Sequence, residues 1–150
     1  MNISQFCLPA DAPAKRFSGI RRPFGIRRWM YATDACICVR IPATIVSKAV
    51  ERVPAANLLF KHFRAAKCTE PWPGDEVVEM ERDTFGDLVI PLAMRIGNRR
   101  VGTGYWLVVW QLGEVRYNPA GGPEDSIQFV AGDLQGLLSP MAGCQAGGGE

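Results

Sequence analysis

The last third of the chain is cut by glycine- and proline-rich turns into three short, strand-like segments. These are "EVRYNP", "SIQFVAG" and "QGLLSPM", and the turns between them are "AGGPED" and "GD". Val, Ile, Phe and Tyr favour strands, whereas Gly, Pro, Asn and Asp favour turns. The sequence therefore predicts three successive short strands, followed by a flexible glycine-rich tail over 142–150.

Two upstream regions also predict strand pairs. "VVEMERD" and "DLVIPLAMRIG" are expected to be strands on either side of a "TFGD" turn. "WMYATDACICVRIP" predicts two strands that meet near Thr33–Ala35, with Asp34 at the corner and Pro42 at the end. Most of the chain is thus expected to form sheet.

Two segments carry helical patterns. Residues 55–67 follow Pro54 and place Leu58, Leu59 and Phe63 on one side of a predicted helix. Residues 101–112 have apolar residues at helical spacing, but their β-branched and aromatic content favours a strand. Propensity alone does not decide the second segment.

Charge is divided unevenly along the 150 residues. Residues 1–68 contain 12 Lys and Arg against 3 Asp and Glu, and residues 69–150 contain 5 against 12, which gives +9 and −7. Such a division predicts two faces of opposite potential, or head-to-tail association of copies as a homo-oligomer. The length and an apolar content of 47% favour one domain with its own core.

The composition gives no sign of a membrane, metal or redox role. The chain has neither a signal-like apolar segment at its start nor a run long enough to span a bilayer, so a cytoplasmic location is expected. The five cysteines lack CxxC spacing, and we expect them to act as small hydrophobic residues rather than in disulfides or a metal site. No cofactor is predicted.

Three basic doublets recur every six residues between 15 and 28, with aromatic residues between them. Cations neutralise phosphates, and aromatic rings stack on unpaired bases, so this pattern is typical of nucleic-acid contact without sequence readout. The alternative is a loop of solvated arginines whose aromatic residues anchor it to the core. Lys61, Arg64 and Lys67 form the polar side of the predicted 55–67 helix and allow the same two interpretations.

"YATD", followed by an apolar strand and Arg40, resembles the "ATDGHRL" hairpin of the bacterial sliding clamp, the β subunit of DNA polymerase III. "GLLSPM" resembles that family's final strand, "YVVMPMRL", and residues 86–141 follow the element order of a clamp half-domain. The resemblance implies an α+β, clamp-like single domain over 1–141, an antiparallel sheet with one or two helices on one face. It also implies that residues 101–112 form a helix and that residues 43–85 are an insertion.

The chain departs from the family pattern in several places. Ala35 and Cys36 replace the family's Gly-His pair, Ser139 replaces a methionine, and no Arg-Leu follows Met141. In the family, helices with Lys and Arg line the DNA pore, whereas residues 101–112 have no charge and only Arg99 and Arg100 stand at their start. The chain is similar to small, phage-borne, single-domain relatives of the clamp.

The predicted function is a non-enzymatic, clamp-like module that binds DNA or replication proteins. The predicted nucleic-acid contacts are Lys15, Arg16, Arg21, Arg22, Arg27, Arg28, Lys61, Arg64, Lys67, Arg99 and Arg100. His62 has no carboxylate near it in sequence, and "GTG" at 102–104 lacks the phosphate-loop pattern. The alternative function is a phage-encoded factor that docks on a host replication or defence complex without touching DNA.

Overall fold

The computed structural model describes residues 3–7, 23–43, 56–73, 77–82 and 88–141. In chain order its elements are η1 (Ser4–Phe6), β1 (Phe24–Ile26), β2 (Trp29–Thr33), β3 (Ile37–Pro42), α1 (Ala56–Leu59), η2 (Ala65–Lys67), β4 (Glu70–Pro71), β5 (Val77–Arg82), β6 (Leu88–Ile96), β7 (Arg99–Gly102), α2 (Thr103–Trp110), β8 (Arg116–Tyr117), β9 (Ile127–Ala131) and β10 (Leu134–Leu138). The predicted strands are confirmed: β2 and β3 form in "WMYATDACICVRIP", β5 and β6 in the middle of the chain, and β8, β9 and β10 in its last third. The "TFGD" turn and the 142–150 tail lie outside the described residues.

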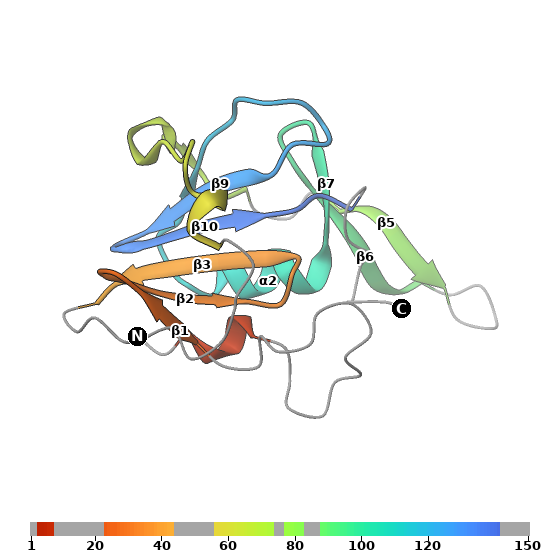
Figure 1. Cartoon of the computed structure of the whole chain (residues 1–150). Helices are drawn as coiled ribbons and strands as arrows, with labels where there is room; N and C mark the ends of the chain where they lie inside the picture. Colours follow the sequence, from red (N-terminus) through yellow and green to blue (C-terminus); the bar gives the residue numbers. More distant parts are fainter. Residues whose placement is uncertain (1–2, 8–22, 44–55, 74–76, 83–87, 142–150) are drawn as a thin grey trace.

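The described strands form two antiparallel sheets. The large sheet has seven strands in the order β1-β2-β3-β10-β9-β8-β4, and the small sheet has three in the order β5-β6-β7 (Figure 1). Within residues 43–85, β4 joins the edge of the large sheet beside β8, and β5 pairs with β6. This arrangement confirms the α+β class.

The "YATD" corner forms as expected. The Asp34 carboxylate accepts hydrogen bonds from the backbone N–H groups of Cys36 and Ile37, at 2.9 and 3.0 Å. This side-chain-to-backbone bonding stabilises a turn without continuing either strand. The last strand, β10, pairs antiparallel with β3 of this hairpin, so the two motifs that carry the clamp resemblance lie side by side.

Helix α2 confirms the helical prediction for most of residues 101–112, although Val101 still belongs to β7. Val109 is fully buried, and Tyr105, Trp106 and Val108 pack against the same core. We call the sheet face toward this core the inner face. On it, Gly136 leaves room for the Phe129 ring, because a Cβ at position 136 would overlap the ring.

The expected helix over 55–67 is wrong. Helix α1 ends at Leu59, and a turn leads to the short 3₁₀ element η2. Phe60 is buried at 4% exposure, whereas Leu58 and Leu59 are 61% and 59% exposed, so the predicted apolar stripe is not the buried side. Tertiary contacts of Phe60 and of the backbone beyond it replace helical hydrogen bonds in this segment.

The resemblance implied that the helices lie on one face of the sheet, and this expectation is wrong for the large sheet. Helix α2 lies behind β2 and β3 in Figure 1, whereas α1 lies in front of the sheet. Phe60, which follows α1, packs on Tyr31 in a cluster separate from the main core. We call the side on which Phe60 packs the outer face.

The described cysteines behave in two ways, and Cys144 lies outside the described residues. Cys7, Cys38 and Cys68 are free and buried, in agreement with their expected role as small hydrophobic residues. Cys36, at the partly exposed hairpin corner, is disulfide-bonded, so the expectation is wrong for this residue.

Candidate nucleic-acid interface

The outer face of the large sheet is defined by alternation along each strand and by the pairing between strands. Its described positions are Phe24 and Ile26 of β1, Trp29, Tyr31 and Thr33 of β2, Cys38, Arg40 and Pro42 of β3, Gln135 and Leu137 of β10, Gln128 and Val130 of β9, Arg116 of β8, and Pro71 of β4. Arg40 and Arg116 carry the only charges among these described positions. The face therefore offers cations and no strand carboxylate.

Arg40 is fixed at the centre of this face between two aromatic rings. Its guanidinium carbon lies 4.0 Å from the centroid of the Trp29 ring and 4.3 Å from that of Phe60. Its Nε donates to Gln135 Oε1 at 2.9 Å. A cation held against ring faces gains about 0.5–2 kcal/mol per contact, so the guanidinium is held in a defined orientation.

The aromatic side chains continue on either side of Arg40. The rings of Phe24 and Tyr31 stack with centroids 5.5 Å apart and an interplanar angle of 10°. Tyr31 meets Phe60 edge-on, and Phe60 contacts Phe63 at 5.6 Å. Tyr31 and Phe60 are buried, whereas Phe24, Trp29 and Phe63 are partly exposed at the rim of the cluster.

Gln128 of β9 fastens the chain between α1 and η2 to the outer face. Its Oε1 accepts from the backbone N–H of Arg64 at 2.9 Å, and its Nε2 donates to the carbonyl of His62 at 3.3 Å. Lys61, Arg64 and Lys67 are all exposed on this segment. One neutral side chain thus holds the backbone at His62 and Arg64 against the sheet, within the segment that carries these three cations.

The β1–β2 hairpin carries two more cations at its tip. Ile26 pairs with Trp29, so the connection consists of Arg27 and Arg28 alone, and both are exposed. Arg27 has φ 56°, a left-handed conformation that two-residue turns normally give to Gly, Asn or Asp. A side chain at such a position costs about 1–2 kcal/mol, so an arginine there points to a role beyond folding.

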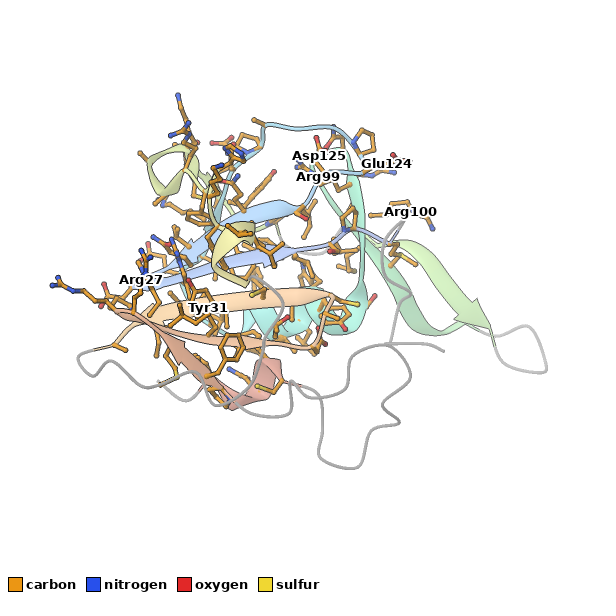
Figure 2. All side chains as sticks on the ribbon, viewed as in Figure 1. Arg27, Tyr31, Arg99, Arg100, Glu124 and Asp125 are labelled. Carbon is orange, nitrogen blue, oxygen red and sulfur yellow. The ribbon has the colours of Figure 1, made fainter. Side chains whose placement is uncertain are left out.

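Several of the described carboxylates are engaged away from the outer face. Asp34 accepts from Tyr105 Oη at 2.7 Å, on the α2 side of the sheet. Burial raises the pKa of the Tyr105 hydroxyl, and the hydrogen bond to Asp34 raises it further. Asp125 accepts from the Gly122 N–H, and Figure 2 shows Glu124 and Asp125 far from Arg27 and Tyr31.

The structure places the predicted contact residues in different settings. Arg27, Arg28, Lys61, Arg64 and Lys67 are exposed around the outer face. Arg100 is exposed, but Figure 2 places it well away from Arg27. Lys15, Arg16, Arg21 and Arg22 lie outside the described residues.

The predicted nucleic-acid contact of Arg99 is wrong, because only 1% of its surface is exposed. Its Nε donates to the Asp125 carbonyl at 2.9 Å and its Nη2 to the Ala120 carbonyl at 2.6 Å. Burial lowers the pKa of the guanidinium, and the nearby Asp125 carboxylate opposes this effect. Arg99 holds the 118–126 loop and has no surface to offer a phosphate.

Sequence reasoning did not assign Arg40 and Arg116 to the site. Arg116 is exposed on β8, and its Nη1 donates to the Thr69 carbonyl at 2.8 Å. Each arginine lies within a short strand, where its face follows from alternation only once the strand pairing is known. The cross-strand pairs of Tyr31 with Arg40 and of Val130 with Arg116 provide this information.

A metal site or a reactive thiol would require particular side chains and surroundings among the described residues. No group of three or more His, Cys, Asp or Glu side chains among them could hold a metal ion. Burial raises the pKa of the Cys68 thiol to about 11 and, against smaller opposing effects, that of Cys38 to about 12. These thiols are protonated near neutral pH and are poor nucleophiles.

Neither a protein-family model nor a curated protein sequence matches this chain, and no solved structure matches its fold. Membership of the sliding-clamp family therefore stays a prediction from the sequence. In the described part of the chain, no helix has both the length and the apolar character needed to cross a bilayer.

Proposed function

We propose that the chain is a non-enzymatic, clamp-like module that binds DNA through its outer face without reading sequence. The observation that supports this is the charge of that face. Arg27 and Arg28 stand at one side, Lys61, Arg64 and Lys67 at the other, and no described strand residue between them is acidic. Phosphate neutralisation by such a set supplies affinity that depends on salt and not on sequence.

Two features of the fold agree with the clamp likeness. Ala35, which stands where the family has glycine, has φ 83° and so takes the left-handed conformation that favours glycine. The final strand pairs with the "YATD" hairpin, and a helix precedes the last three strands. The uncharged α2 cannot attract a duplex, so the proposal assigns DNA to the sheet rather than to the helix.

The test is fluorescence anisotropy of labelled 20-nucleotide DNA, single-stranded and duplex, titrated with protein at 50 mM and 200 mM salt. Replacing Lys61, Arg64 and Lys67 by Ser should weaken binding and reduce the slope of log K against log salt by about two units. Arg100→Ser is the matched control, because it removes an exposed cation that lies elsewhere. Undetectable binding at 50 mM salt, or a loss per removed charge that is as large for Arg100→Ser as for the triple variant, contradicts the proposal.

A second candidate function is supported by helix α2. Leu107 and Trp110 are 43% and 46% exposed, and residues 101–113 contain no charge. Trp110 stacks on Trp106 at 5.4 Å, so its ring is held in place at the surface. Exposed apolar residues on an uncharged helix are typical of a protein-docking surface.

This second function predicts a protein partner from a host replication or defence complex. The experiment is a pull-down from nuclease-treated host lysate with the wild-type chain and with Leu107→Ser/Trp110→Ser. A partner that survives nuclease and is lost only in the double variant supports docking through α2. Recovery of the same proteins with both chains contradicts it.

A further inference from the structure

The outer face presents flat aromatic groups between its two sets of cations, and phosphate binding alone does not require them. Phe24, Trp29 and Phe63 are the partly exposed aromatic members of the cluster. Trp29 directly follows the cationic hairpin tip, and Phe63 directly precedes Arg64. A partly exposed ring therefore stands next to a cation in the chain at each of these two places.

The rings and the Arg40 guanidinium form stacked arrangements already. Arg40 lies between Trp29 and Phe60, and Phe24 lies almost parallel to Tyr31. Tyr31 is 1% exposed whereas Phe24 is partly exposed, which makes Phe24 the outer member of its pair. The flat aromatic face of a nucleobase can extend such a stack.

Only unpaired bases can use these surfaces. In a duplex the faces of the bases are covered by neighbouring base pairs, so rings at the protein surface meet sugar and phosphate instead. In a single strand the bases can turn outward, and stacking on aromatic side chains tolerates every base. Cations that follow the backbone then act together with rings that take the bases.

We propose that the outer face prefers single-stranded DNA, with bases stacked on Trp29, Phe24 and Phe63 and phosphates held by Arg27, Arg28, Lys61 and Arg64. This inference rests on the proposed DNA-binding function and names its substrate class. It predicts a mixed interface, in which removal of a ring affects one form of DNA and removal of a cation affects both.

The experiment measures binding of labelled dT20 and of a 20-base-pair duplex by anisotropy at 50 mM salt, with wild type, Trp29→Leu, Phe63→Leu and Arg27→Ser/Arg28→Ser. Wild type should bind dT20 at least tenfold more tightly than duplex. Each ring variant should lose about tenfold for dT20, the amount expected for one stacked base, and little for duplex. The arginine variant should lose affinity for both.

Thermal melting of each variant accompanies the titrations. Phe63→Leu lies on the exposed segment and provides the result should Trp29→Leu fail to fold. Tighter binding of duplex than of dT20, or unchanged dT20 binding by folded ring variants, overturns the single-strand preference and leaves phosphate binding intact. No binding of either DNA overturns the proposed function itself.

Discussion

Replacing Arg27 by glycine should stabilise the fold and weaken DNA binding at the same time. Arg27 has φ 56°, and a left-handed conformation costs a residue with a Cβ about 1–2 kcal/mol. Glycine removes this cost but gains freedom in the unfolded chain worth about 0.4–1 kcal/mol. The net expectation is about 0.5–1 kcal/mol of added stability, seen as a rise in Tm of about 2–3 °C.

The loss of affinity follows from counterion release. One phosphate contact on single-stranded DNA contributes about 0.7 to the slope of log K against log salt, and 1 M to 50 mM salt is about 1.3 decades. Loss of that contact should therefore cost about eightfold in affinity at 50 mM salt. Urea denaturation and anisotropy with dT20 measure the two effects on the same sample.

Two control variants separate strain from charge. Arg27→Lys keeps both and should match wild type in stability and affinity. Ala35→Gly relieves a second left-handed position, φ 83°, and should stabilise the chain without changing DNA binding. If Arg27→Gly is less stable than wild type, the strain argument fails; if it binds dT20 as tightly as wild type, the functional argument fails.

Three further predictions concern other residues. Arg99→Ala should lower the free energy of unfolding by about 2–4 kcal/mol, because two carbonyls of the 118–126 loop lose a charged donor; urea melts of the variant and wild type measure the difference. Gln128→Leu should weaken DNA binding several-fold without removing a charge, because the segment around Arg64 loses its two hydrogen bonds to the sheet. The slope of log K against log salt should equal that of wild type, which distinguishes a loosened segment from lost phosphate contacts. The raised pKa of Cys68, about 11 against 9.0, means that the unfolded chain loses this proton first; the contribution of Cys68 to the free energy of unfolding should be constant well below pH 9 and fall by about 1 kcal/mol by pH 10, measured as the difference between wild type and Cys68→Ala in urea melts across pH.

Sequence patterns predicted the elements of this fold where local chemistry determines them. Asp34 forms the corner because its carboxylate bonds the next backbone N–H groups, which is a local effect. The break after Leu59 could not be predicted, because it depends on Phe60 packing against Tyr31 and on Gln128 bonding to the chain near Arg64. Those partners are 29 or more positions away in sequence.

The same division applies to the candidate site. Arg27 and Arg28 were recognisable as exposed cations because a doublet between aromatic residues is visible in the sequence. Arg99 and Arg100 look equivalent in sequence, yet the first is buried and bonded to loop carbonyls. Strand alternation gives neighbouring residues opposite faces, and only the position of the 118–126 loop decides which of the two is covered.

The uncharged helix α2 and the cationic outer face of the large sheet offer two different surfaces to partners. Helix α2 exposes Leu107 and Trp110, whereas five exposed cations surround the outer face of the large sheet, namely Arg27, Arg28, Lys61, Arg64 and Lys67. Both proposed functions can then operate in one molecule, because DNA and a protein partner would occupy different faces. If so, DNA binding by the outer face and protein binding by α2 should be independent of each other. Arg27→Ser should lower DNA affinity without affecting a nuclease-resistant partner, and Leu107→Ser should do the reverse, whereas a loss of both in either variant means that the two faces do not act separately.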